Sequence, residues 1–261
     1  MGRRRGRAHA LSSLELPLWS WAIGGAVLGL IAGSFLATIV QRWPRGESAL
    51  SGRSRCDHCG QTIAARDLVP LAGFVLLGGK CRSCGGRIDP THVTIEGLCG
   101  LIGAAAMLIA PGHAGLLGAV FGWLLVTLAA LDLKHFWLPD PLVLALVLVA
   151  AAGAATGLEP PPIDRVVGAI AGFGALTLIA VTYRRLRKRD GLGGGDPKLL
   201  GAIGAMLGWQ SLPLVLLGAS SVGLLFVAIR MMTGHKVEAT DRMPLGALMA
   251  LAAFPIWIYQ Q

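Results

Sequence analysis

The sequence predicts an all-α membrane protein with about eight transmembrane helices and a small zinc-ribbon-like domain between the first two. Of 261 residues, 54% are hydrophobic and only 14% are charged, and the mean hydropathy is +0.65. One soluble core could not bury so much apolar surface, which excludes an ordinary soluble enzyme. The 37 glycines fit helices that pack closely in lipid, and four of the five cysteines form two tight pairs. These observations together predict a helical membrane protein with one metal-binding insertion.

The helices are predicted from stretches that lack Asp, Glu, Lys and Arg. There are six such stretches: Leu16 to Gln41, Gly97 to Leu131, Pro141 to Leu158, Val166 to Tyr183, Leu199 to Ile229 and Met243 to Gln261. About 20 apolar residues cross a bilayer, so the second and fifth stretches are each long enough to cross twice. Turn residues at Pro111 to His113 and at Trp209 to Pro213 divide them. Eight transmembrane helices result.

The basic residues predict the orientation. The net charge of +9 could indicate a nucleic-acid partner, but in a membrane protein basic residues act first as topology signals, so no nucleic acid is expected. Placing the segment 42–87 in the cytoplasm leaves 18 of the 23 basic residues inside and 5 outside. An even number of helices then puts both termini on the outer side. The arginine run at the N-terminus is the exception to this pattern.

The polar segment after the first helix carries the cysteine pairs. Cys56 and Cys59 form one Cys-x-x-Cys knuckle, and Cys81 and Cys84 form the other. Two such knuckles match a tetrahedral zinc site of four thiolates, which has no open position and is therefore structural. The alternative is a pair of disulfides or a set of free thiols. His58, inside the first knuckle, is interpreted as a bystander.

Two aspartates at predicted cytoplasmic helix ends are the candidate catalytic residues. Asp132 follows a long uncharged stretch, and Asp196 follows three glycines and precedes another. Two carboxylates that meet share one proton, so one serves as base and the other as acid in peptide hydrolysis. The alternative for Asp132 is a helix cap or a partner for the nearby Lys134. Asp140 is interpreted as a turn or cap residue.

Taken together, these features resemble the type IV prepilin peptidase family, over nearly the whole chain. The resemblance rests on these motifs: Gly33-Ser34-Phe35-Leu36 with Arg42 and Pro44, the two cysteine knuckles followed by Glu96, Asp132 with Leu138-Pro139-Asp140, Gly193 to Asp196 with Lys198, and Met243 to Gly246. It implies an intramembrane aspartic endopeptidase of the Gly-x-Gly-Asp class with Asp132 and Asp196 as its dyad. Its location would be the bacterial inner membrane, with the active site facing the cytoplasm.

The resemblance also implies partners and a second activity. Prepilins or pseudopilins would be the substrates, within membrane lipid, and the oligomeric state is left open. Many members also methylate the new amino terminus with S-adenosylmethionine. Gly193 and Gly195 are expected to let the substrate backbone approach Asp196, and Lys198 is grouped with them as a substrate-binding residue. Glu96 is expected to contact the basic leader peptide; its alternative is a helix cap or a partner for an arginine.

The predicted organisation has three parts: an N-terminal extension with the first helix (1–41), a zinc-binding domain (42–95) and a seven-helix peptidase core (96–261). Two other functions remain open. A proton- or cation-coupled transporter could use the two aspartates, although carboxylates near mid-helix and an internal repeat would then be expected. A non-catalytic zinc-ribbon scaffold would leave the aspartates unexplained.

Overall fold

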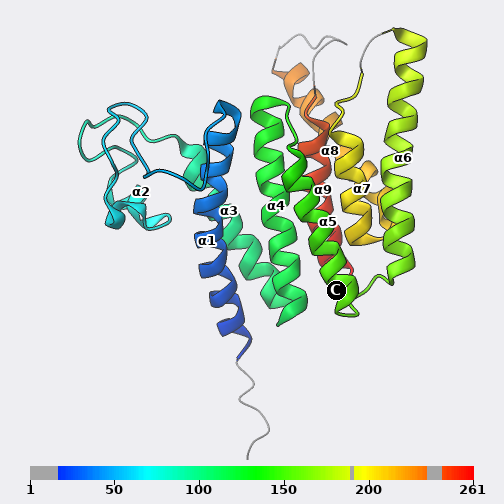
Figure 1. Ribbon diagram of the computed structural model, residues 1–261, viewed down its shortest axis with the longest axis horizontal. Coiled ribbons are helices and arrows are strands. Elements are labelled where there is room, and N and C mark those ends of the chain that lie inside the picture. The colour runs from blue at the N-terminus through cyan, green and yellow to red at the C-terminus, as the bar shows by residue number, and fades with distance from the viewer. Residues whose placement is uncertain (1–16, 189–190, 234–242) are drawn as a thin grey trace, which may run out of the picture.

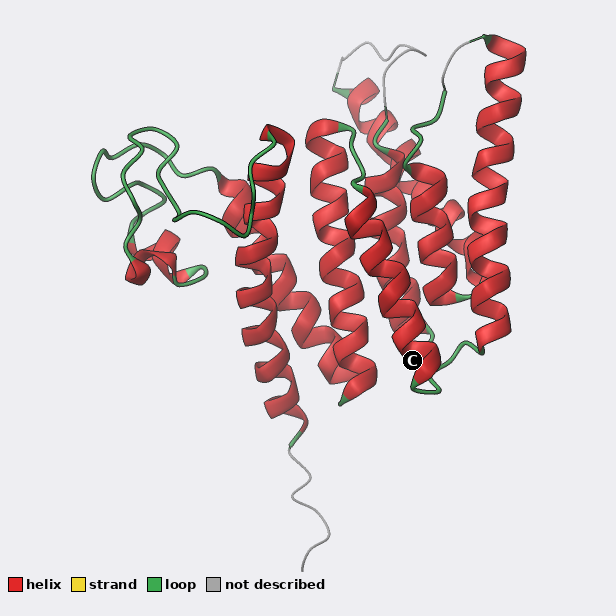
Figure 2. Cartoon of the chain, in the orientation of Figure 1, coloured by secondary structure: helices red, strands yellow, loops and turns green. Residues whose placement is uncertain are grey.

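The computed structural model describes residues 17–188, 191–233 and 243–261. Within those ranges the regular structure is helical apart from two isolated β-bridges (Figures 1 and 2). The α-helices are α1 (Leu18–Arg42), α2 (Ala72–Leu76), α3 (Pro90–Ile109), α4 (His113–His135), α5 (Asp140–Ala155), α6 (Pro162–Arg187), α7 (Asp196–Leu207), α8 (Leu212–Met232) and α9 (Leu245–Tyr259). The all-α prediction is confirmed for the described residues.

Apart from the short α2, these helices lie where the uncharged stretches predict them. The two long stretches break between α3 and α4 and between α7 and α8, as expected from their turn residues. Gly208 ends α7 with φ +80°, a conformation that favours glycine. Among the described residues, α1, α3, α4, α6 and α8 are long and apolar enough to cross a membrane, whereas α5, α7 and α9 are shorter. The chain is therefore a multi-pass membrane protein.

Glycines bring α1 against α3. Gly25, Gly29 and Gly33 recur every four residues, so they share one face of α1. A Cβ atom at Gly25 would lie 2.2 Å from the carbonyl oxygen of Gly103 on α3. The two backbones are in direct contact, as small residues allow in membrane helices. Gly168 on α6 meets Gly204 on α7 in the same way.

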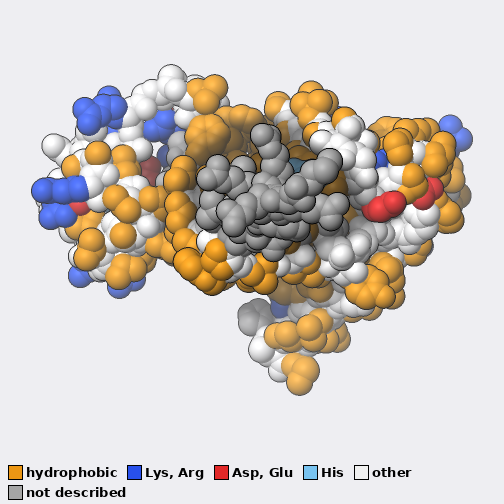
Figure 3. All heavy atoms as spheres, turned by 90° about the horizontal axis from the view of Figure 1, so that it is seen from below, with side chains coloured by type: hydrophobic (Ala, Val, Ile, Leu, Met, Phe, Trp, Pro, Cys, Tyr) orange, Lys and Arg blue, Asp and Glu red, His pale blue; other side chains and the backbone are white. Residues whose placement is uncertain are grey.

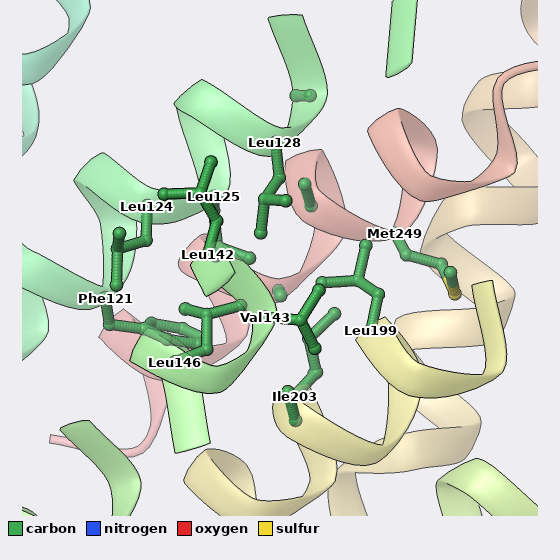
Figure 4. Packing of buried hydrophobic residues seen from close by; sticks show 14 of the residues in the cluster. Phe121, Leu124, Leu125, Leu128, Leu142, Val143, Leu146, Leu199, Ile203 and Met249 are labelled. Atoms are coloured by element: carbon green, nitrogen blue, oxygen red, sulfur yellow. The ribbon is translucent and has the colours of Figure 1, made fainter. Parts of the chain in front are cut away.

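The core lies between α4, α5, α7 and α9. Figure 4 shows side chains from these helices meeting there, including Phe121 and Leu128 from α4, Leu146 from α5 and Leu199 from α7. By contrast, α6 and α8 leave most of their apolar side chains exposed. Seen from the lower end of Figure 1, hydrophobic side chains surround the helices, whereas Lys and Arg gather over the segment 43–89 (Figure 3). The exposed apolar surface is suited to lipid.

The helices alternate in direction, so their connections fall at two ends. The loop that follows α4 and the loop that precedes α7 lie at the upper end of Figure 1, and the segment 43–89 lies beside the upper half of α1, while α1 begins and the chain ends at the lower end. At the lower end the buried Arg165 donates to the carbonyl oxygens of Ala205 and Met206 (3.3 and 3.1 Å) at the end of α7. This basic residue therefore caps a helix instead of marking the outer side.

Candidate active site and metal site

Asp132 lies in the last turn of α4 and is 5% exposed. Its Oδ2 atom accepts a hydrogen bond from the backbone N–H of Ala247 in the first turn of α9 (2.8 Å). Lys134, two residues further on, instead contacts Asp89 and Thr91 at the start of α3. The alternative that Asp132 serves as the partner of Lys134 is therefore excluded.

Asp196 is the first residue of α7 and is 7% exposed. Its Oδ2 atom accepts from the backbone N–H of Gly193 (3.1 Å), so the glycine loop folds back onto the carboxylate. Asp132 lies close enough to interact with Asp196 electrostatically, and the N–H of Gly246 faces both carboxylates. Helices α4, α7 and α9 thus bring two buried carboxylates together around one backbone segment.

The side chain of Leu138 fills the space beside two of the glycines near the carboxylates. A Cβ atom at Gly195 would lie 2.7 Å from Cβ of Leu138, and one at Gly246 would lie 2.8 Å from Cδ1 of the same leucine. At Gly193 it would lie 3.1 Å from Oδ2 of Asp196, whereas Gly194 has nothing within 4 Å. Gly195 and Gly246 therefore pack against Leu138, and Gly193 packs against the carboxylate of Asp196. Open space lies beside Gly194.

An ion pair lies beside this cluster. Lys198 Nζ contacts Oδ1 of Asp140 (2.7 Å), which joins the first turn of α7 to the first turn of α5. Both side chains are partly exposed. Asp140, interpreted from the sequence as a turn or cap residue, is therefore an ion-pair partner within helix α5.

The four paired cysteines converge in the segment between α1 and α3. Their sulfur atoms all lie within 4.8 Å of one another, and Cys56 Sγ and Cys84 Sγ are 3.9 Å apart. Four sulfurs bound to one zinc at about 2.3 Å would be about 3.8 Å apart. The cysteines are free thiols, so the disulfide alternative is not supported. The cluster has the donors and the spacing to hold a metal ion.

The two knuckles share one backbone pattern. Gly60 N–H donates to the carbonyl oxygen of Cys56, and Gly85 N–H donates to that of Cys81, each at 2.9 Å. An isolated antiparallel bridge flanks each knuckle. The backbone N–H groups of Cys84 and Ser83 lower the pKa of the Cys81 thiol to about 6, which favours the thiolate.

A cavity of about 880 Å³ is lined by residues of this segment, α1 and α3. Glu96 of α3 lines it and is 4% exposed. One oxygen of Glu96 accepts from the N–H of Leu71 (2.9 Å), and the other lies 3.3 Å from Nε2 of His92. Among the residues that the structure describes, Glu96 therefore contacts neither the start of its helix as a cap nor an arginine. Its contacts join α3 to the polar segment.

Comparison with known proteins bears on this arrangement. The bacterial peptidase A24 N-terminal domain matches residues 27–110, and the type IV leader peptidase family matches residues 119–228. A protein of Aeromonas hydrophila named prepilin leader peptidase/N-methyltransferase is 37% identical over 207 residues, covering 77% of this chain and 70% of its own length. The chain belongs to the type IV leader peptidase family. Proteins of the same name from Dickeya chrysanthemi and Stutzerimonas stutzeri are 39% and 32% identical, covering 78% and 87% of this chain and 81% and 87% of their own lengths.

The two family matches place the cysteine cluster and the two aspartates in different domains, and the structure also keeps these two groups apart. The N-terminal domain match contains most of α1, the cysteine cluster and all of α3, and the leader peptidase match contains both aspartates. No solved structure matches the chain. The comparisons give no support to the transport alternative.

Sequence reasoning missed the residues that hold the aspartates in place. Gly246 and Ala247 supply backbone N–H groups to the carboxylates from a helix more than 100 residues after Asp132. Leu138 packs between the glycines. The motif from Met243 to Gly246 could have indicated these residues, because it places a glycine in the first turn of a helix, where glycine does not favour helix formation.

Proposed function

We propose that this chain is a membrane aspartic endopeptidase that cleaves the basic leader peptides of type IV prepilins or pseudopilins and methylates the new amino terminus. The single observation that carries the proposal is the meeting of two buried carboxylates, Asp132 and Asp196, at one end of the helices. The names of the relatives supply the substrate class and the second reaction.

In the proposed reaction, Asp132 and Asp196 share one proton. The ionised carboxylate takes a proton from water as the water oxygen attacks the scissile carbonyl carbon. The protonated carboxyl donates to the carbonyl oxygen, and a proton is delivered to the leaving amine as the C–N bond breaks. The N–H groups of Ala247 and Gly193 hold the carboxylates in position for these transfers. No covalent intermediate with the protein is needed.

The orientation is part of the proposal. We place the upper end of Figure 1 in the cytoplasm of a bacterium and the helices in its inner membrane, because most of the basic residues that the structure describes belong to the segment 43–89 or to the helix ends and loops on that side. Eight spans follow if α5, α7 and α9 cross together with the longer helices. Helix α7 has 12 residues, about 18 Å at 1.5 Å per residue, so its Asp196 would lie below the membrane surface. A basic leader would stay on the cytoplasmic side, near the dyad.

The substrate contacts proposed near the dyad involve the loop before α7. Gly194 has open space, so a substrate backbone has room beside Gly193 and Gly195 once Leu138 moves. Lys198 has its ammonium group at the same edge and would contact the substrate by exchanging its partner Asp140 for a substrate group.

Zinc is the metal proposed for the cysteine cluster. Four thiolates within one tetrahedron favour zinc over magnesium or calcium, which prefer oxygen ligands. A four-thiolate shell leaves no open position, so the ion would stabilise the segment 43–89 and take no part in catalysis.

The cavity beside this segment is the proposed site for the methyl donor. Its volume is typical of a small-molecule site. Phe74, Leu77 and Ile88 offer apolar surface for an adenine ring, and carboxylates such as Asp57 and Asp67 line the same cavity. These residues fit S-adenosylmethionine, which when bound supplies a methyl group activated by a sulfonium.

The decisive experiment incubates the purified protein with a prepilin in detergent and measures the product masses. Wild type should yield a product shortened by the leader and heavier by one methyl group. Asp132→Asn and Asp196→Asn should each lower cleavage at least about 100-fold, the usual contribution of a catalytic acid or base. The matched control Asp140→Asn should retain substantial cleavage. A dead Asp140→Asn variant beside an active Asp132→Asn variant would mean that the dyad is wrongly assigned.

A further inference from the structure

A histidine lies on the wall of the cavity between α1, α3 and the segment 43–89. His92 belongs to the first turn of α3, and its side chain is 28% exposed. Its Nε2 atom is 3.3 Å from Oε1 of Glu96 and 3.5 Å from Oγ of Ser34 on α1. All three residues line the cavity. A buried carboxylate, a histidine and a hydroxyl thus meet at one place, away from the two aspartates.

The buried carboxylate determines which nitrogen of His92 carries the proton. Because Glu96 accepts at Nε2, the neutral ring keeps its hydrogen there and leaves the lone pair on Nδ1. Within the described ranges, Nδ1 has no hydrogen-bond partner. The other oxygen of Glu96 is fixed by the N–H of Leu71, so the carboxylate cannot turn away from the ring. This pair has the arrangement of a general base and the carboxylate that orients it.

The cavity lies between a membrane helix and the polar segment, so two different molecules could enter it from different sides. Ser34 lies eight residues before the end of α1, about 12 Å along the helix, so this wall of the cavity belongs to the membrane helices. The opposite wall belongs to the polar segment. A ligand with an apolar helix could present its polar end from the lipid side, while a water-soluble ligand enters from the other. The contact of Lys134 with Asp89 keeps this cavity at the same end as Asp132.

We propose that this cluster is the site that binds and deprotonates the primary amine at the amino terminus of the cleaved substrate before methyl transfer. The inference rests on the proposed function, because the amine arises from leader cleavage. Glu96 attracts the ammonium group, and His92 Nδ1 removes one of its protons. The neutral nitrogen then attacks the methyl carbon of the sulfonium donor. The N–C bond forms as the C–S bond breaks, the thioether leaves, and the proton on His92 passes to water.

This assignment gives Glu96 a role other than contact with the leader peptide. A charged amine fits its position, since the carboxylate is buried in the cavity wall beside a histidine. His92 would be a catalytic residue that touches the amine, and Glu96 a positioning residue that acts mainly through the ring. The contrasting explanation is a plain i, i+4 pair that only stabilises the first turns of α3.

The test compares three substitutions in the full-length protein in detergent: His92→Gln, Glu96→Gln and the matched control His113→Gln. His113 begins α4 at the lower end, far from the cavity. His92→Gln should lower the methylation rate at least about 100-fold, the loss expected for a general base. Glu96→Gln should lower it at least about tenfold, because its amide favours the opposite tautomer of His92. The control should behave as wild type.

Two further readouts separate catalysis from structure. Leader cleavage by the same variants should stay within about twofold of wild type, since neither residue touches the aspartates. Binding of radiolabelled S-adenosylmethionine, measured by equilibrium dialysis, should be unchanged. Equal loss of cleavage and methylation would identify a structural pair and overturn the inference, as would normal methylation by His92→Gln. Wild type that cleaves without methylating would also overturn it, whereas wild type that does neither would refute the proposed function itself.

Discussion

Replacing Gly29 by alanine tests whether the α1–α3 contact holds the cavity together. The added Cβ would lie 2.1 Å from the carbonyl oxygen of Cys99, whereas ordinary contact begins at 3.4 Å, so the helices must separate by about 1.3 Å. The obstacle is backbone and cannot rotate away. Overpacking of this kind costs about 1–3 kcal/mol. The same oxygen accepts from Trp123 Nε1 (2.8 Å), a hydrogen bond worth about 1 kcal/mol that the shift would weaken.

Gly24→Ala is the matched control, because a Cβ there has nothing within 4 Å. Both changes gain the same helix propensity, so the difference between them isolates packing. Unfolding in mixed micelles, followed by tryptophan fluorescence, should show Gly29→Ala less stable than Gly24→Ala by about 1–3 kcal/mol. Methylation should fall before cleavage does, since α1 carries Ser34 but neither aspartate. Equal stability of the two variants would refute the close contact.

Three shorter predictions concern other contacts. Cys84→Ser should lower the zinc content well below one per chain while Cys99→Ala leaves it unchanged, as metal analysis under reducing conditions will show; a zinc-free wild type would contradict the site. Lys198→Gln should reduce cleavage more than Asp140→Asn, because only the lysine is proposed to contact substrate; equal losses would indicate that the ion pair merely joins α5 to α7. Asp89→Ala should destabilise the start of α3 by about 1 kcal/mol, because its carboxylate caps Thr91 (2.8 Å), whereas Asp89→Asn should keep the cap.

The pH dependence of the Asp89 cap follows from its pKa. Hydrogen bonds from Thr91, and to a lesser extent the charge of Lys134, hold this pKa below its ordinary value of 3.8. The ionised cap therefore stabilises the protein fully above pH 3.8 and is lost as the pH falls through the lower folded value. The difference between wild type and Asp89→Ala should shrink in that acid range, measured by proteolysis near residue 89. A difference that stayed constant down to the lowest pH would contradict the assignment.

Local patterns in the sequence were sufficient to predict the helices and the clustering of the four paired cysteines. Uncharged stretches broken by glycine and proline predict the positions of the long helices, because lipid forces every span to satisfy its backbone within one helix. The cysteine knuckles needed no long-range information beyond their own spacing, since each is a tight turn with its own hydrogen bonds. The candidate aspartates could also be named from the sequence, as carboxylates are rare and costly beside membrane helices.

What surrounds those residues depended on the tertiary structure. The N–H groups that hold Asp132 come from α9, and the side chain that fills the space at Gly195 comes from the loop after α4, so no local pattern connects them. The sequence predicts a leader contact for Glu96, and only the packing of α1, α3 and the polar segment shows that its side chain is buried beside His92 and Leu71. The sequence determined which groups can carry charge or bind metal, because those properties belong to single side chains. Which of them meet was decided by helix packing, because a contact between distant residues exists only once the helices between them are in place.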